Sequence, residues 1–231
     1  MKKTWKRFLR FIKYFLIFFF GTSIFFVVLY RFVNPPLTPL MLIRNYQQRA
    51  NGEAFKLTKS WKSLDEISPN LQLAVIASED NHFLKHSGLD FEAIKNAREY
   101  NDNNKGKKVR GASTISQQTA KNVFLWPDQG WVRKGLEVYF TFLIEIVWGK
   151  KRIMEVYLNV IEMGDGIYGA EAASQHYFHK AASHLTREQA ALIAVSLPNP
   201  RKFNPLRPTS YLISRQQWIL LNMANIGSVD Y

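Results

Sequence analysis

The apolar residues are distributed unevenly along the chain, and their longest run lies near the N-terminus. Residues 14–30 form a stretch of 17 residues without a charge, and apolar character extends over residues 11–33 with Lys13 and Arg31 as the interruptions. At about 1.5 Å per residue, a helix of this length spans a hydrocarbon core of roughly 30 Å if its long terminal side chains reach the interface. The pattern predicts a transmembrane anchor over residues 14–33.

The charges on either side of this run predict its orientation. Six basic residues and no acid precede it, whereas Arg31 alone follows it closely, so the positive-inside rule places residues 1–13 in the cytoplasm. A cleaved signal peptide is an alternative, but residues 31–34 lack a small-residue cleavage pattern. A buried core helix, the other alternative, would not need phenylalanine on all its faces. The predicted parts are a cytoplasmic tail (1–13), an anchor (14–33), a proline-containing linker (34–40) and an exported domain (41–231).

The exported part shows apolar periodicity of helical length. Helices are predicted over residues 40–49, 71–78, 131–148, 153–160, 186–196 and 209–225. Ser68-Pro69 has the residue types of an N-cap and a first helical position, and Thr186 with Gln189 has those of a capping box. No strand-like alternation of any length is present. The sequence therefore predicts a mainly α fold.

The net charge and the absence of cysteine limit which binding partners and which catalytic chemistries are possible. The formal net charge is +13, and the part after the basic tail remains basic. Nucleic acid, anionic lipid head groups and a pyrophosphate-bearing substrate all fit such a charge. The chain has no cysteine, which excludes disulfides, thiol catalysis and zinc sites built on cysteine.

Two adjacent carboxylates, Glu79 and Asp80, end the apolar segment LQLAVIAS. At least one of them is expected to be partly desolvated, which would raise its pKa and make it a better proton acceptor near neutral pH. The alternative is that one acid forms a local cap or salt bridge. The residues alone leave both interpretations open.

A second polar segment, residues 111–122, is rich in small and hydrogen-bonding side chains. Ser113 and Thr114 can cap a following helix, and a helix N-terminus favours anions. Lys121 lies on the same helical face as Gln117 and Gln118, so this face could hold a phosphate and a sugar together. An ordinary capped helix with a solvated polar face is the alternative.

A basic pair and an acid follow at helical spacing. Arg133 and Lys134 have side chains suited to a diphosphate, and Glu137 could orient them or a substrate hydroxyl.

Five segments together resemble the signature motifs of the peptidoglycan glycosyltransferases, in the same order and at the same separations. They are EDxxFxxHxG at 79–88, GxSTxxQQxxKN at 111–122, RKxxE at 133–137, KRIMEVYLN with GDGIYG at 151–169, and AALxAxxLPxP at 190–200. The resemblance covers roughly residues 40–225. The chain has no Ser-x-x-Lys tetrad, so the resemblance is to the monofunctional members, without a transpeptidase domain.

This resemblance implies a lysozyme-like helical fold, a bacterial inner-membrane location with a periplasmic catalytic domain, and lipid II and the growing glycan strand as substrates. Undecaprenyl pyrophosphate would be released with inversion at the anomeric carbon, giving a β-1,4 linkage. Glu79 would be the general base, and Lys121 and Arg133 would stabilise the leaving pyrophosphate. Further donor-binding residues are expected at Ser113, Thr114, Gln118, Asn122 and Lys134. Glu137 matches the family's second essential acid, and we assign it to positioning the donor site.

No cofactor and no metal ligand set is predicted. His82 and His86 are interpreted as structural, and His176 and His179 as surface or core residues. The reaction could use a divalent cation such as Mg²⁺ or Mn²⁺, but the sequence does not indicate a binding site for one. Expected partners are membrane lipids and division or elongation synthases, and the outward topology argues against nucleic acid.

A membrane contact is a further hypothesis. Two apolar clusters, 124–126 and Trp131, are expected to dip into the bilayer, with Lys105, Lys107, Lys108 and Arg110 holding anionic head groups. Core packing is the alternative for each apolar residue. The polar run 101–108 is predicted to form a mobile loop over the cleft.

Two rival functions remain from the sequence. A murein-cleaving lysozyme or lytic transglycosylase would also use a glutamate at a helix end, but as an acid, and would not need Lys121 and Arg133 on a diphosphate. A non-enzymatic scaffold of the cell envelope would not need the clustered motif acids.

Overall fold

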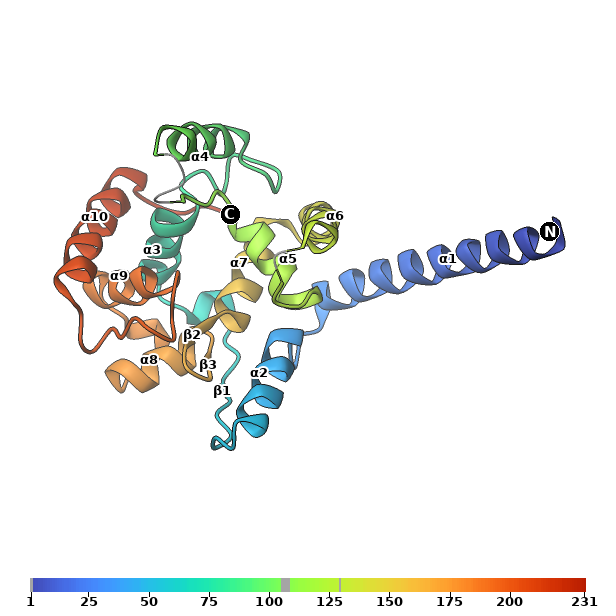
Figure 1. The fold of residues 1–231 in the computed structure, drawn as a ribbon. Helices are drawn as coiled ribbons and strands as arrows, with labels where there is room; N and C mark the ends of the chain where they lie inside the picture. Colours follow the sequence, from blue (N-terminus) through green and yellow to red (C-terminus); the bar gives the residue numbers. More distant parts are fainter. Residues whose placement is uncertain (1, 105–108, 129) are drawn as a thin grey trace. The chain divides into compact units, whose positions relative to one another are not determined.

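The computed structural model describes residues 2–104, 109–128 and 130–231 of the chain (Figure 1). It divides into two compact units, Met1–Asn34 and Pro35–Tyr231.

The first unit is one continuous helix, α1 (Lys2–Phe32). Its segment Thr4–Phe32 is long and apolar enough to cross a membrane, with a mean hydropathy of 2.2 in its most apolar window. This makes α1 a candidate membrane span, as the apolar run predicts. The helix also includes most of the basic tail, so tail and anchor are not separate elements of secondary structure.

The second unit is mainly helical. Its α-helices are α2 (Pro39–Ala50), α3 (Pro69–Glu79), α4 (Phe91–Asn103), α5 (Ile115–Phe124), α6 (Trp131–Val147), α7 (Gly149–Val160), α8 (Ala170–Phe178), α9 (Arg187–Ser196) and α10 (Ser210–Ile226). Two short 3-10 helices, η1 (Leu64–Glu66) and η2 (Ala182–His184), complete the helical elements described. Each of the six periodic segments lies within or overlaps a helix, whereas α4 and α8 were not predicted.

The predicted caps are present. The Ser68 side chain accepts a hydrogen bond from the Asn70 backbone N–H at the start of α3, and Pro69 is the first helical residue. Thr186 and Gln189 form a capping box at the start of α9. The largest boundary difference is at α7, which begins at Gly149, so the basic residues 150–152 form its first turn and do not lie between two helices.

A small sheet was missed by the sequence analysis. Its strands are β1 (Thr58–Lys59), β2 (Glu162–Gly164) and β3 (Ile167–Tyr168), in the order β1-β3-β2. β1 pairs in parallel with β3, and β2 pairs antiparallel with it. Strands of two or three residues are too short to show an alternation of polar and apolar positions. Gly166 turns the chain between β2 and β3 at φ 73°, where a Cβ would lie 2.6 Å from the Lys56 carbonyl oxygen.

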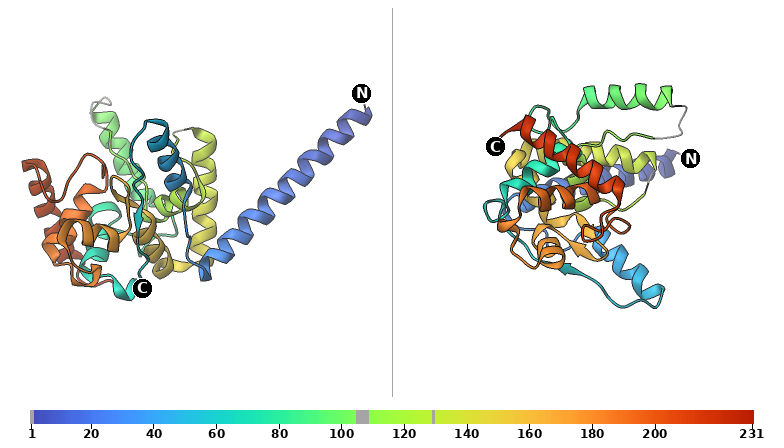
Figure 2. Two further views of the ribbon diagram at one scale, coloured as in Figure 1. Left: turned by 90° about the horizontal axis from the view of Figure 1, so that it is seen from below. Right: turned by 90° about the vertical axis from the view of Figure 1, so that its left-hand side faces the viewer.

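The larger helices form two groups. In Figure 1, α3, α9 and α10 gather on the left of the second unit, and α5, α6 and α7 lie on the right; the members of each group pack against one another. α4 lies at the upper edge in Figure 1 and in the right-hand view of Figure 2. The C-terminal end of α3 meets the N-terminal end of α5, because Ile115 N–H donates to the Asp80 carboxylate. The polar motifs lie at this junction between the two groups.

The buried hydroxyl of Tyr168 allows a prediction of whether its removal raises or lowers the stability of the fold. The hydroxyl of Tyr168 is buried and has no hydrogen-bond partner among the described residues, whereas that of Tyr177 donates to Met163 O at 3.1 Å. An unpaired buried hydroxyl costs free energy, and a paired one contributes about 1 kcal/mol. We therefore expect Tyr168→Phe to leave the midpoint of thermal unfolding in detergent unchanged or higher, and Tyr177→Phe to lower it. A Tyr168→Phe protein that unfolds at a clearly lower temperature would contradict this account.

Candidate active site

Glu79 is the last residue of α3 and faces a cavity of about 670 Å³. Its side chain is half-buried, with one side toward the protein and the other toward the cavity. Ser78 Oγ donates to its Oε1 at 3.2 Å, and Gln118 Nε2 donates to its Oε2 at 2.8 Å. The carboxylate is therefore held by hydrogen bonds and still accessible from the cavity.

Burial raises the pKa of the Glu79 carboxyl above its ordinary value. The hydrogen bonds from Gln118 and Ser78 and the nearby charge of Arg215 work in the opposite direction, and Asp80 adds to the increase. A carboxylate in this environment is a stronger base than one in water, which suits proton abstraction from a hydroxyl. The expected desolvation of one acid is thus found at Glu79.

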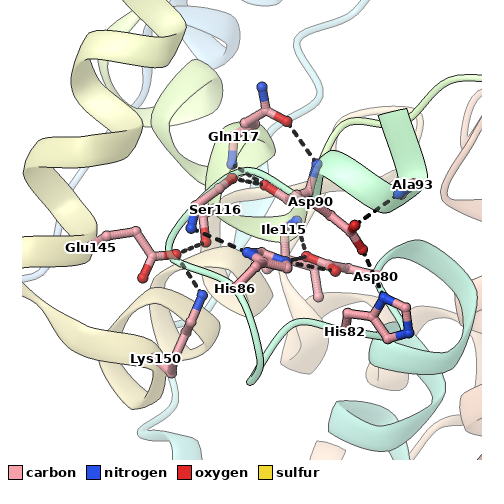
Figure 3. Close-up of polar contacts among 12 residues, drawn as sticks. Asp80, His82, His86, Asp90, Ala93, Ile115, Ser116, Gln117, Glu145 and Lys150 are labelled. Atoms are coloured by element: carbon pink, nitrogen blue, oxygen red, sulfur yellow. Dashed lines mark hydrogen bonds and ion pairs between the residues drawn. The ribbon is translucent and has the colours of Figure 1, made fainter. Parts of the chain in front are cut away.

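The neighbouring Asp80 has a structural role. Figure 3 shows its carboxylate between His86 and the backbone of Ile115, with His86 Nε2 donating at 2.9 Å and Ile115 N–H at 3.0 Å. His82 pairs in the same way with Asp90, at 2.9 Å. Both expectations for the acid pair therefore apply, one to each residue, and His82 and His86 each pair with an aspartate as structural histidines do.

Within the described ranges there is no group of three or more His, Asp or Glu side chains that could hold a metal ion. Whether the reaction uses a divalent cation stays a prediction. His176 and His179 lie on the surface of α8 and at its C-cap.

The helix predicted after Thr114 is α5, and Thr114 caps it. Its Oγ1 accepts a hydrogen bond from Gln117 N–H at 3.1 Å and donates to Gly88 O at 2.6 Å, while Gln117 Oε1 accepts from Thr114 N–H. The side chains of Thr114 and Gln117 are thus used in the capping box, although Thr114 also lines the cavity. Ser113 and Gln118 line the cavity beside Glu79.

A second cavity, of about 520 Å³, lies beside the next turn of α5. Lys121, Asn122 and Arg133 line it. Burial lowers the pKa of the Lys121 ammonium; Glu137 and Glu79 act against this shift, while Arg133 and Lys134 add to it. Lys121 is therefore within electrostatic reach of the base and of the whole RKxxE motif. Asn122 Nδ2 donates to Gln118 O at 2.7 Å, so part of its amide is already engaged.

Glu137 holds the basic pair in place. It is 3% exposed and forms ion pairs with Arg133 Nη1 at 2.5 Å and with Lys134 Nζ. Arg133 is itself buried, and its Nε has no hydrogen-bond partner among the described residues. Arg133 lines the cationic cavity, and its planar, positively charged guanidinium is suited to bind an anion.

The structure thus brings the predicted residues together on two sides of α5. Gln118 reaches the cavity of Glu79, and Lys121, almost one turn later, reaches the cationic cavity. The predicted base and the predicted cations therefore lie in two cavities, and residues of α5 line both.

Four polar or aromatic residues of these cavities were not predicted: Arg44 in the cationic cavity, and Tyr211, Arg215 and Trp218 in the cavity of Glu79. Arg215 lies 3.6 Å over the ring of Trp218 on α10 and interacts electrostatically with Glu79. No local sequence signal distinguishes these residues, because tertiary folding brings α2 and α10 to the site.

The proposed membrane clusters divide into two kinds. Leu125 is buried and Phe124 stacks on Phe140 at 4.5 Å, so these two belong to the packing of the protein. Trp126 is 43% exposed and Trp131 is 92% exposed, so a bilayer contact stays a prediction for them. Lys105, Lys107 and Lys108 lie outside the described residues, and Arg110 lines the cavity of Glu79. In the predicted loop 101–108, residues 101–103 belong to α4, residues 105–108 lie outside the description, and only Asn104 follows the helix.

The chain is similar to known proteins over most of its length. A family model described as Transglycosylase matches residues 47–224. A biosynthetic peptidoglycan transglycosylase from Bacteroides thetaiotaomicron is 56% identical over 215 residues, which cover 93% of this chain and 86% of the relative. Proteins of the same name from Bdellovibrio bacteriovorus (54% identical, covering 97% of this chain and 89% of the relative) and Haemophilus influenzae (48%, covering 98% and 89%) are also similar.

These matches confirm the family resemblance and, with the helical architecture, the predicted lysozyme-like, mainly α fold class. The chain therefore belongs to the transglycosylase family and is a glycosyltransferase enzyme.

Proposed function

We propose that this enzyme polymerises lipid II into linear β-1,4-linked glycan strands of peptidoglycan and releases undecaprenyl pyrophosphate. The observation that carries this proposal is the arrangement around α5. A carboxylate with a raised pKa lies in one cavity, and a buried cationic cluster lies in the next, within electrostatic reach. The names of the relatives, which specify biosynthesis of peptidoglycan, agree with a transferase that builds glycan.

In the proposed reaction, Glu79 accepts the proton of the GlcNAc 4-hydroxyl of the acceptor. The hydroxyl oxygen forms a bond to C1 of the terminal MurNAc of the growing chain, while the bond from C1 to the pyrophosphate oxygen breaks. The bonding electron pair leaves with the pyrophosphate, and the anomeric centre inverts from α to β. Tyr211 and Trp218 offer aromatic faces for sugar rings in the cavity of Glu79.

The leaving group gains negative charge in this step, and positive side chains stabilise it. Lys121 and Arg133 are placed for that role, and Arg44 adds a further cation to the cavity. Pyrophosphate leaves without protonation, so Glu137 need not act as an acid. Its two ion pairs support the positioning role, because they fix the directions in which Arg133 and Lys134 point.

We further propose that α1 anchors the enzyme in the bacterial inner membrane with the second unit on the periplasmic side. The six basic residues that precede the apolar run support this orientation. Trp131 and the neighbouring Val132 are both largely exposed and support a bilayer contact near the cationic cavity. Division or elongation synthases stay candidate partners.

A direct assay separates this function from murein cleavage. Purified full-length enzyme in detergent is expected to convert lipid II into glycan polymer and to release no soluble muropeptides from purified murein. Muropeptide release without polymer would favour the hydrolase, and neither product would favour a scaffold. An inhibitor that mimics the pyrophosphate should block polymer formation.

A further inference from the structure

A chain of three polar side chains links the base to the core of the other helical group. Tyr157 on α7 places its hydroxyl 3.2 Å from Gln118 Oε1 on α5. Gln118 Nε2 in turn donates to Glu79 Oε2 on α3, at 2.8 Å. The hydroxyl, the amide and the carboxylate therefore form one chain of hydrogen bonds that connects three helices.

Tyr157 and Gln118 differ in how closely the protein packs around them. Tyr157 is fully buried, among the core residues Ile153, Met154 and Leu158 of its own helix, and α7 packs against α5. Gln118 is half-buried and lines the cavity, and its long side chain has several rotatable bonds. A rigid group in the core thus contacts a flexible group at the site.

The chemistry of the amide makes its orientation important. A glutamine side chain has a donor end and an acceptor end, whereas an ionised carboxylate only accepts. If the amide turned over, its oxygen would face the Glu79 carboxylate and the hydrogen bond would be replaced by repulsion. Burial raises the pKa of the Tyr157 phenol well above its ordinary value, so its O–H stays a donor at neutral pH. Because the Tyr157 hydroxyl is a donor, it favours the orientation of the Gln118 amide in which the amide oxygen faces Tyr157.

We propose that Tyr157 is a positioning residue for the base: its hydroxyl fixes the amide of Gln118, which then holds the Glu79 carboxylate in its reactive orientation. This inference rests on the proposed function of Glu79. It gives Gln118 a role at the base in place of the donor-binding role expected from the sequence. Tyr157 acts through Gln118 and does not contact substrate.

Other charged groups around Glu79 act by electrostatics and cannot replace this contact. Asp80 follows it in the chain, Lys121 approaches from α5, and Arg215 approaches from α10. α9 carries charge only in its first turn, at Arg187 and Glu188. The remaining titratable groups of the cavity are His82, Asp90, Arg110 and Tyr211. The hydrogen bonds to the carboxylate that the structure describes come from Ser78 and Gln118.

The first test is Tyr157→Phe in the full-length enzyme. We expect kcat for lipid II polymerisation to fall about tenfold, with KM little changed, since about 1.4 kcal/mol of orientation energy is lost. The acid limb of the kcat–pH profile should move to higher pH. The reason is that a weaker hydrogen bond from Gln118 favours the ionised carboxylate less, which raises the pKa of Glu79.

Tyr177→Phe is the matched control, because it removes a buried hydroxyl on a different helix, α8, where Tyr177 donates to Met163 O of strand β2. It should lower thermal stability and leave both kcat and the acid limb unchanged. A Tyr157→Phe enzyme that behaves like this control would overturn the inference, since a merely structural hydroxyl would have the same effect.

Gln118→Met provides a second test that leaves the core untouched. It should reproduce the fall in kcat and the shift of the acid limb. In this background the further change Tyr157→Phe should have no additional effect on kcat, because the hydroxyl acts through the amide. Additive losses in the double variant, or a rise in KM alone for Gln118→Met, would contradict the positioning role.

The failure of the inference differs from the failure of the proposed function. If Glu79→Gln is inactive while Tyr157→Phe matches Tyr177→Phe, the positioning role fails and the function of Glu79 stands. If Glu79→Gln turns over like the wild type, both fail.

Discussion

Glu79→Gln is expected to lower kcat for lipid II polymerisation by about a thousandfold, because the loss of a general base typically costs a factor of 10² to 10⁴. The glutamine preserves the shape of the side chain and its hydrogen-bonding reach but cannot take a proton. In the wild-type enzyme the acid limb of the kcat–pH profile should lie above the usual range of a glutamate, because burial raises the pKa of Glu79. Steady-state rates on purified lipid II from acid to neutral pH measure both effects.

The same substitution should not destabilise the fold. Because the pKa of Glu79 is raised in the folded state, the protonated carboxyl stabilises the protein at low pH, and this contribution is lost as the pH rises through the folded pKa. A neutral glutamine avoids that loss, so the thermal midpoint near pH 7 should be equal or higher. Asp80→Asn is the contrasting neighbour: it weakens the contacts to His86 and Ile115 N–H and should lower the midpoint. Wild-type turnover in Glu79→Gln would remove this residue from the mechanism.

Lys121→Met is expected to lower kcat/KM for lipid II by about a hundredfold, since a cation in a partly desolvated site stabilises the pyrophosphate as its charge develops. Methionine retains the length and the apolar character of the lysine stem. Burial lowers the pKa of Lys121, so the charge is unfavourable to folding and its removal should not lower the thermal midpoint. The decisive measurement is polymerisation rate against lipid II concentration, together with the midpoint.

Lys202→Met serves as the matched control, because Lys202 is exposed and lines neither cavity. Its kinetics should equal those of the wild type. Arg133→Ala is a less clean probe, because it would leave the buried Glu137 with one of its two cationic partners. Equal kinetics for Lys121→Met and Lys202→Met would reject the pyrophosphate role of Lys121.

The features that local sequence determines were predicted well. An uncharged apolar run predicted the candidate span α1, and side-chain caps predicted the starts of α3 and α9, because caps involve residues only a few positions apart. The position of Glu79 and Asp80 at the end of an apolar segment predicted that one of the two acids would be partly desolvated, and the motif resemblance assigned the role of base to Glu79. The motif resemblance supplied the remaining site residues.

The features that depend on distant contacts were not predicted. The strands of the small sheet are too short for a periodic pattern, and β1 pairs with β3 although Thr58 and Ile167 lie far apart in the sequence. Arg44 and Arg215 look like ordinary surface arginines of amphipathic helices until α2 and α10 are folded against the site. Tyr157 reads as a core aromatic, and only the structure shows its hydroxyl beside Gln118.

The contact between Asp80 and α5 has a consequence for where a phosphate can bind. Ile115 N–H is the first amide of α5, and the Asp80 carboxylate already accepts its hydrogen bond, while Thr114 and Gln117 use further groups of that first turn. The positive end of the α5 dipole is thus neutralised by the protein's own acid. A diphosphate at this helix end would be repelled by the Asp80 carboxylate, so its binding depends on cationic side chains. Substitutions that remove the charge of Lys121 or Arg44 should therefore change donor affinity directly.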